Sequence, residues 1–398
     1  MARTNAIVVG ALLSLGLTPL LAGPAAHADV EDLILSVLDV ADWGALVPPG
    51  AGPDLDAPGA AEAIASTLGA GSTADPAATL SDATASVPLT VEGVGAGQPV
   101  VDVSLSGGQP IPVALDTGSK GLEVSIGDVP SQDVMHALRH FSVDDLHVNL
   151  FPAGINIGLE IPTTVGFGDG IVADHALVDA VFFSFPFSVI GAQRLAGAPV
   201  DGILGIGPNA GGSHLVTTDL PGDLSDGVLI DEPAKQLVFG PEPDTVDGLS
   251  PIATLDGAPF AGSPFHPQDL QVQIGSEAKH DVAVVFDSGG KGGWLPPSLA
   301  DGYPRGLLGF GNVPDKTPIS VYTPDGELLY SYPTSGGSGA MIIVPGWLLR
   351  LLGIDYPLVN TGNAAFLEDP VYISNADGGT MTFYGPTVYG STQIPPGG

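Results

Sequence analysis

From Val87 onward, the chain alternates short apolar stretches with turns that are rich in glycine and proline. The apolar stretches show only patchy alternation of apolar and polar residues, which is typical of strands buried in packed sheets. Helical periodicity is sparse, with MHALRHF near residue 140 and GWLLRLLG near residue 350 as the best short candidates. The pattern therefore predicts an all-β fold. Its clearest strands are VPLTVEGV, PVVDVSLSGG, PIPVALDTG, HALVDAVFFSF and QLVFGPEP.

The first residues of the chain have a different pattern. Arg3 precedes an apolar run over residues 6–22, and the small-residue sequence AHA follows at 26–28. This order is typical of a secretory signal peptide, so we predict one over residues 1–28. No later run is apolar and long enough to cross a bilayer, so we expect no transmembrane segment in the mature chain. The expected location is outside the cell or in the cell envelope.

Residues 29–85 form a separate zone rich in Ala, Gly, Ser, Pro and Asp, with ten acidic residues and no basic one. Such a composition is typical of a largely disordered tether. A linker and a cleaved prosegment both fit it. A prosegment that blocks an acidic site with a lysine is excluded, since the first basic residue after Arg3 is Lys120.

Composition excludes some classes of function. The 398 residues carry a net charge of −34 with only 10 Lys and Arg, which excludes a nucleic-acid binder that works through phosphate contacts. The chain has no cysteine, which excludes disulfides and a thiol nucleophile. The 57 Gly and 38 Pro suit many short strands joined by turns.

An internal repeat is the most informative feature. VALDTGSKGLEVS at 113–125 aligns without a gap with VVFDSGGKGGWLP at 284–296, 171 residues further on. Two apolar residues precede each aspartate by 15 and 13 positions: Val101 and Val103 in the first copy, Val272 and Ile274 in the second. Each copy therefore predicts a strand, a turn, a second strand and then Asp-(Thr/Ser)-Gly. Two lobes of similar plan, related by a pseudo-two-fold axis, would produce such a repeat.

The repeat offers an explanation for an aspartate placed in apolar surroundings. If Asp116 and Asp287 lie in contact, both cannot ionise, and the pair shares one proton. Such a pair can act as base and acid in one step, with one carboxylate taking a proton from water and its partner protonating a carbonyl oxygen. This chemistry needs no metal and no cofactor, and we expect neither.

The motifs resemble those of the pepsin-like aspartic proteases, over about residues 87–390. DTGS at 116–119 and DSGG at 287–290 resemble the two catalytic motifs, and DGILGIG at 201–207 resembles the apolar-apolar-Gly element that supports the first catalytic loop; PLVNTG at 357–362 is a weaker match for the second such element. The resemblance implies a bilobal, all-β acid protease fold with a cleft between two pseudo-two-fold-related lobes. It places the N-terminal lobe at residues 86–245 and the C-terminal lobe at 246–398.

A narrower resemblance is to the mycobacterial aspartic proteases that process exported PE-domain proteins, carried by the tail ISNADGGTMTFYGPTVYG and by FDSGG. Here a signal peptide is predicted at the start of the chain, not a PE domain. The substrate of those proteases is therefore not carried over.

The resemblance also implies roles for single residues. Asp116 and Asp287 match the catalytic pair, and Thr117 and Ser288 match the hydroxyls that brace the two catalytic loops against each other. Gly118 and Gly289, the glycines that follow Thr117 and Ser288, are expected to bind the substrate.

Two departures from the family pattern affect the site. Ser119 matches the hydroxyl that binds the outer oxygen of the first aspartate, whereas its counterpart in the second copy is Gly290. We therefore expect Asp287 to lack that donor and to ionise less readily than Asp116. The best match to the substrate-covering flap is TTVGFGDGIV at 163–172, where Phe167 replaces the usual tyrosine and Gly168 follows it.

The remaining candidate residues have simpler explanations. Lys120 and Lys291 occupy the same place in both repeats, where they either tune the aspartates or point into solvent. His136, His140 and His147 lie close in sequence, but no spacing of carboxylates or cysteines around them is typical of a metal site. We expect ordinary loop histidines and no metal.

Two functions remain open. The first is an exported aspartic endopeptidase that cleaves extended polypeptides, with exported or cell-surface proteins as substrates. The second is a surface binding protein on the same fold with weakened or lost catalysis, which Phe167 and Gly290 favour. Because one chain supplies both aspartates, we expect a monomer.

Overall fold

In the computed structural model, the described residues belong to one compact unit. The predicted signal peptide and most of the predicted acidic linker lie outside the described residues, as does Lys291. The described residues are 84–92, 97–142, 145–151, 154–186, 200–256, 270–290, 292–306, 308–334, 341–351, 356–376 and 378–385.

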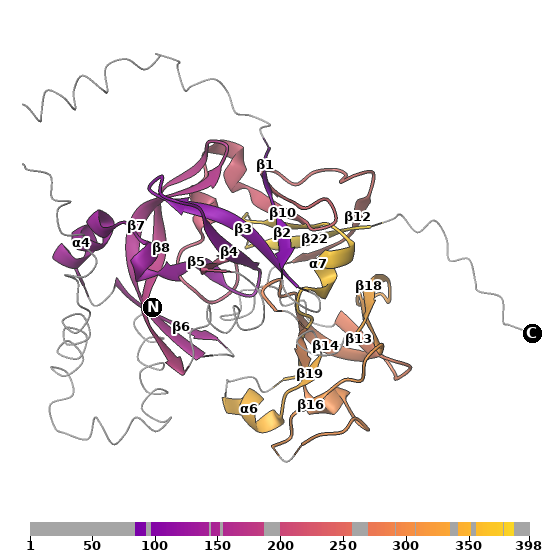
Figure 1. Ribbon diagram of the computed structural model, residues 1–398. Helices are drawn as coiled ribbons and strands as arrows, with labels where there is room; N and C mark the ends of the chain where they lie inside the picture. Colours follow the sequence, from indigo (N-terminus) through magenta and orange to yellow (C-terminus); the bar gives the residue numbers. More distant parts are fainter. Residues whose placement is uncertain are drawn as a thin grey trace, which may run out of the picture. The chain divides into compact units, whose positions relative to one another are not determined.

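Three sheets make up the fold, which confirms the all-β, bilobal prediction. Two eight-stranded sheets each come from one continuous part of the chain, and a six-stranded sheet combines strands from both parts. Figure 1 shows the strands of the first part in indigo and magenta and those of the second in orange and yellow.

The first eight-stranded sheet is built around the strand that carries Asp116. Its order is β2-β3-β4-β9-β5-β8-β7-β6, and the β4–β9 and β5–β8 pairs are parallel. Strands β7 and β8 form a long hairpin, against which α4 packs (Figure 1). The strands are β2 (Thr90–Glu92), β3 (Gln98–Leu105), β4 (Ile111–Asp116), β5 (Lys120–Ser125), β6 (Leu146–Phe151), β7 (Gly154–Gly168), β8 (Ile171–Pro186) and β9 (Gly202–Ile206).

The second eight-stranded sheet has the order β16-β19-β15-β20-β14-β13-β17-β18, with β14–β20 and β15–β19 as its parallel pairs. Its strands are β13 (Leu270–Ile274), β14 (His280–Val285), β15 (Trp294–Leu295), β16 (Gly311–Asn312), β17 (Pro318–Tyr322), β18 (Leu328–Pro333), β19 (Ile342–Ile343) and β20 (Leu358–Asn360).

The six-stranded sheet has the order β1-β11-β10-β21-β22-β12, and all its pairs are antiparallel. It joins residues from the start and the end of the described chain. Its strands are β1 (Ala85–Pro88), β10 (Gly227–Asp231), β11 (Gln236–Phe239), β12 (Ser250–Asp256), β21 (Val371–Ser374) and β22 (Thr380–Gly385).

Each copy of the sequence repeat folds into an antiparallel hairpin that leads to its aspartate. In the first copy β3 pairs with β4, and in the second β13 pairs with β14. β4 and β9 are almost wholly buried, as are the last four residues of β14, which explains the continuous apolar sequence of these segments. The predicted strands and turns of the repeat are therefore confirmed.

Helices are short and few among the described residues. α4 (Ser131–Arg139) and α6 (Gly346–Leu351) confirm the two helical candidates, and α7 (Ala364–Glu368) follows β20. Within the described ranges, none of the helices has the length and apolar character needed to span a bilayer.

Candidate active site

Asp116 and Asp287 stand at the ends of equivalent strands and face each other. Asp116 is the last residue of β4, and Asp287 follows the end of β14 by two positions. A Cβ atom added to Gly118 would lie 2.9 Å from Cγ of Asp287, and one added to Gly289 would lie 2.6 Å from Cγ of Asp116. Each glycine therefore makes room for the aspartate of the other loop, and the structure brings together all four of these predicted site residues.

The two loops are joined by reciprocal hydrogen bonds. The Thr117 amide donates to Ser288 Oγ at 3.0 Å, and the Ser288 amide donates to Thr117 Oγ1 at 2.9 Å. Each hydroxyl in turn donates to a backbone carbonyl of the opposite strand, Thr117 to Phe286 and Ser288 to Leu115. Both side chains are fully buried, so these bonds hold the loops in a fixed relation. The structure thus places Thr117 and Ser288 where the predicted brace requires them.

Burial changes the titration of Asp116. Desolvation, together with the nearby charge of Asp287, raises the pKa of Asp116 well above its ordinary value, although bonds from Ser119 and the Gly118 amide oppose the shift. The arrangement can hold one acid and one base side by side.

The first carboxylate is held by its own loop. The Gly118 amide donates to Asp116 Oδ1 at 2.7 Å, and Ser119 Oγ donates to Asp116 Oδ2 at 2.6 Å. Ser119 therefore makes the contact that the resemblance implies.

The second carboxylate is held by a residue that the sequence analysis missed. Asn360 Nδ2, at the end of β20, donates to Asp287 Oδ2 at 2.6 Å, and Asn360 Oδ1 accepts from the Gly362 amide at 2.8 Å. The prediction that Asp287 lacks a donor for this oxygen is therefore wrong. Gly290 leaves the space for it, because a Cβ there would lie 2.9 Å from Asp287 Oδ2.

Further buried contacts support the second loop. The Asn363 amide donates to the Gly290 carbonyl at 2.5 Å, and Asn363 Nδ2 donates to Glu232 Oε2 at 3.2 Å. Burial raises the pKa of Glu232 to about 8 despite the bond from Asn363. Gln98 of β3 donates its side-chain amide to the Gly289 carbonyl. The loop of Asp287 is thus tied to β3 and to Glu232, the residue that follows β10.

Phe167 does not lie over the two aspartates. The hairpin at 163–172, predicted as the flap, is therefore not in the position of a substrate-covering element. Its ring is 3% exposed and packs on Phe239 of β11, with ring centroids 4.9 Å apart. The neighbouring residue Gly166 pairs with Ser104 near the end of β3, and that end of β3 lies beside Ile111, at the opposite end of β4 from Asp116. Phe167 is therefore a packing residue at the end of the β7–β8 hairpin, and Gly168, with φ of 93°, forms the turn.

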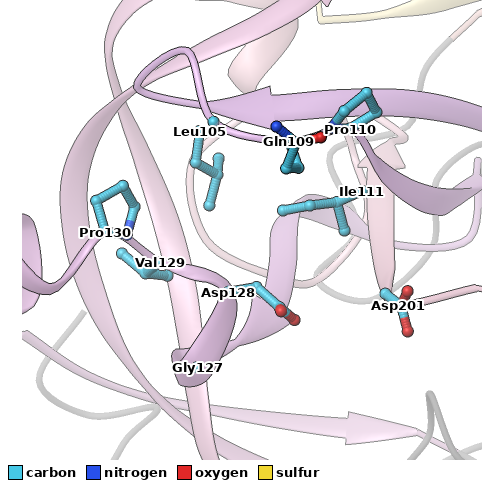
Figure 2. Close-up of a pocket in the computed structure, with 10 residues that line it drawn as sticks. Leu105, Gln109, Pro110, Ile111, Gly127, Asp128, Val129, Pro130 and Asp201 are labelled. Atoms are coloured by element: carbon cyan, nitrogen blue, oxygen red, sulfur yellow. The ribbon is translucent and has the colours of Figure 1, made fainter. Parts of the chain in front are cut away.

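A surface hollow also lies away from the aspartates. It measures about 380 Å³ and is lined by residues of the β3–β4 turn and of the segment before α4. Figure 2 shows the side chains of Leu105 and Ile111 pointing into it, with Asp128 and Asp201 at its border. Since Ile111 begins the strand that Asp116 ends, the hollow is at the far end of β4 and is not part of the candidate active site.

Lys120 begins β5, and its backbone binds the loop that follows β9. Its amide donates to the Gly211 carbonyl at 3.0 Å, and its carbonyl accepts from the Ser213 amide at 3.1 Å. This explains why the chain is fixed here but assigns no role to the ammonium group. Among the three histidines, the rings of His136 and His140 are tilted against each other with their centroids 4.9 Å apart, while His147 lies in a group of carboxylates.

Comparison with known proteins agrees with this geometry. The model of the PE-PGRS C-terminal aspartyl peptidase-like domain matches residues 85–383. The chain is 32% identical over 317 residues to PE cleavage protein A of Mycobacterium tuberculosis, and 33% identical over 318 residues to PE cleavage protein A of Mycobacterium marinum. These alignments cover 74% of the chain and 50% and 51% of the two relatives.

The chain therefore spans about half the length of the curated relatives it matches. The match to the domain model includes both aspartates and Asn360. Both the family model and the relatives support the resemblance inferred from the two Asp-(Thr/Ser)-Gly motifs, and the chain belongs to the family of PE-PGRS C-terminal aspartyl peptidase-like domains.

Proposed function

We propose that the protein is an exported aspartic endopeptidase that hydrolyses peptide bonds of extended polypeptides. The observation that carries the proposal is the close approach of the buried Asp116 and the half-buried Asp287, in which each carboxylate has a hydrogen-bond donor on its outer oxygen. A structural brace alone would not need two carboxyl groups placed against each other, because bringing like charges together away from water is costly.

In the proposed reaction, a water molecule lies between the two carboxyl groups. The ionised carboxylate takes a proton from the water, whose oxygen attacks the carbonyl carbon of the peptide bond. The protonated carboxyl group gives its proton to the carbonyl oxygen, which leaves a tetrahedral diol. Transfer of a proton to the amide nitrogen then allows the carbon–nitrogen bond to break. The raised pKa of Asp116 favours a pair that still holds the required proton in mildly acidic water.

The alternative, a binding protein without catalysis, has lost the two observations that favoured it. Phe167 is a core residue, so its lack of a hydroxyl is no argument about the flap. The absence of a hydroxyl at Gly290 is compensated by Asn360. Both relatives are named for the cleavage of PE proteins, which supports a polypeptide substrate for this chain, and we propose exported or cell-surface proteins as that class.

Asp116→Asn and Asp287→Asn test the proposal. Each change keeps the shape of the side chain but removes one partner of the shared proton, so we expect kcat to fall by at least about a thousandfold. The measurement is cleavage of an unfolded protein between pH 3 and 7, followed by mass spectrometry of the fragments. Folded variants that still cleave at the rate of the unchanged protein would refute the proposal, and the same assay reports whether the chain processes its own N-terminal region.

A further inference from the structure

Three carboxylates lie in one row across neighbouring strands of the first eight-stranded sheet. Asp179 of β8 is the direct cross-strand partner of Glu160 on β7 and of Glu123 on β5. Asp179 is 1% exposed and Glu123 is 3% exposed. Like charges directly opposite each other destabilise a sheet, and buried charges are costly without compensation. A positively charged group beside these three carboxylates would offset both costs.

The described neighbours supply only part of that compensation. Asn149 and Asn156 of the adjoining strands donate their side-chain amides to the two oxygens of Glu123. Asp179 Oδ2 accepts from Asn149 at 3.3 Å and lies 3.0 Å from His147 Nδ1. Among the described residues, no lysine or arginine forms an ion pair with this row.

Asp179 Oδ1 is the atom of this row that lacks a partner in the described part of the chain. It is buried, and among the described residues it has no hydrogen-bond partner. An oxygen of a carboxylate in such surroundings normally has a donor or a cation beside it. It belongs to the central member of the row, between Glu123 and Glu160 and in contact with His147 through its other oxygen.

The same place gathers the ligands of a metal site. His147, Glu160 and Asp179 each offer one ligand atom, and these atoms all lie within 4.8 Å of one another. Zinc binds imidazole nitrogen and carboxylate oxygen at about 2.0–2.2 Å, which separates neighbouring ligands by about 3.3 Å. The 3.0 Å between His147 Nδ1 and Asp179 Oδ2 is close to that separation.

We propose that His147, Glu160 and Asp179 bind one Zn²⁺ ion, with Asn149 holding Asp179 in place from outside the metal site. One imidazole and two carboxylates make a neutral set with Zn²⁺ and leave a fourth position for water. On binding, the ion takes the place of the Nδ1 proton of the His147 imidazolium, and that proton leaves to the solvent while Nε2 keeps its own proton. The site lies on β6, β7 and β8, apart from the loops that carry Asp116 and Asp287, so it does not depend on the proposed protease activity.

Sequence spacing conceals these ligands because they come from three strands. His147 is 13 residues from Glu160 and 32 from Asp179. The expectation of no metal site around the histidines considered only residues near them in the sequence. The β6–β7–β8 meander is what places them together.

Zinc titration of the full chain tests the proposal. The protein is first stripped with a chelator, then titrated with Zn²⁺ alone by calorimetry, and its metal content is measured by mass spectrometry. We expect one tightly bound Zn²⁺ per chain, release of a proton on binding, and a higher melting temperature in the metal-bound form. Failure to take up stoichiometric Zn²⁺ would overturn the proposal.

Variants locate the ion. His147→Gln, Glu160→Gln and Asp179→Asn should each weaken Zn²⁺ binding by at least about tenfold. The His147 side chain is 26% exposed, so its glutamine variant keeps the test valid if Asp179→Asn fails to fold. His280→Gln is the control, since His280 is an exposed residue of β14 in the other eight-stranded sheet and is not part of the three-ligand group. If His147→Gln and Glu160→Gln bind Zn²⁺ as tightly as this control, the site is elsewhere and the proposal is wrong.

Discussion

The two catalytic loops share a motif, a brace and a close approach, yet they hold their carboxylates in different ways. The Asp116 loop provides its own donor, since Ser119 is three residues away. The loop of Asp287 has a glycine at that place and takes its donor from Asn360, 73 residues further along the chain. A local hydroxyl and a distant amide therefore perform the same electrostatic task. Gly290 also leaves room for the carboxylate itself, since a Cβ there would lie 2.9 Å from Asp287 Oδ2 and 3.2 Å from Gly362 Cα.

Among the changes that compare the two loops, the largest loss of activity is expected at the glycines where the loops approach each other. Gly289→Ala would put a methyl group 2.6 Å from the Asp116 carboxyl carbon, a distance that real side chains do not adopt. The loops must then separate or the carboxyl group must turn away, so we expect kcat to fall by at least about a hundredfold, given how steeply rate depends on placement. Cleavage assays and the melting temperature measure the two consequences.

Gly211→Ala is the control for that change, because a Cβ at Gly211 has no heavy atom within 4 Å. It should retain the activity of the unchanged protein. Equal activity of the Gly289→Ala variant would show that the two loops do not need to approach as closely as they do in the structure.

A second prediction compares the two donors directly. Asn360→Ala and Ser119→Ala each remove a hydrogen bond that favours an ionised carboxylate, so each raises the apparent pKa of the pair. Hydrogen bonds to charged groups contribute about 1.5–3 kcal/mol, which corresponds to about one to two pKa units. The acid limb of the profile of kcat/KM against pH should therefore move to higher pH by about that amount in both variants.

A compensating change sharpens this test. In the Asn360→Ala background, Gly290→Ser restores a hydroxyl beside Asp287, as in the first loop, and should return the acid limb toward its original position. In the unchanged background, Gly290→Ser should reduce activity, because the new side chain competes with Asn360 for the same space. An acid limb that stays in place in Asn360→Ala would mean that Asn360 acts on the fold and not on the charge of Asp287.

The smallest effect is expected for the pH dependence of stability. It concerns Glu232, which is buried beside Asn363 and supports the second loop. Its folded-state pKa of about 8 lies above the ordinary value of 4.5, so the folded protein binds this proton more tightly than the unfolded chain does. The resulting stability is complete at low pH and is lost as the pH rises from about 4.5 to about 8. Glu232→Gln should flatten the fall of stability with pH by up to a few kcal/mol, measured by urea unfolding at pH 5 and pH 8. An unchanged slope would show that Glu232 ionises freely in the folded state.

Much of the site could be predicted because the sequence contains two aligned copies of its central motif. The repeat identified both aspartates, and the resemblance to the pepsin-like aspartic proteases implied the bracing role of Thr117 and Ser288. The all-β fold followed from short apolar stretches and frequent turns, because buried strands need continuous apolar sequence.

Asn360 could not be predicted by the same reasoning, because it lies outside the aligned copies. One signal was available: Asn360 and Thr361 stand before Gly362 where the apolar Ile203 and Leu204 stand before Gly205. Polar residues in a buried apolar element need partners, and a search for the partner of Asn360 leads to Asp287.

Phe167 was misplaced for a different reason. A Gly-rich turn after an apolar strand looks the same at either end of a sheet, and only the pairing of Gly166 with Ser104 shows which end it occupies. The carboxylate row of Glu123, Glu160 and Asp179 could not be predicted for a similar reason, because one sequence does not give the pairing register of strands that are distant in the chain.

The six-stranded sheet also limits the order in which the protein can be completed. Strands β21 and β22 come near the end of the chain, yet they lie in the middle of this sheet, between β10 and β12. While the ribosome is still making the chain, β10 and β12 each present an open edge that no earlier strand fills. A chain that stops before Val371 would lack the two central strands, so this sheet, one of the links between the two parts of the fold, is complete only after β22 has been made.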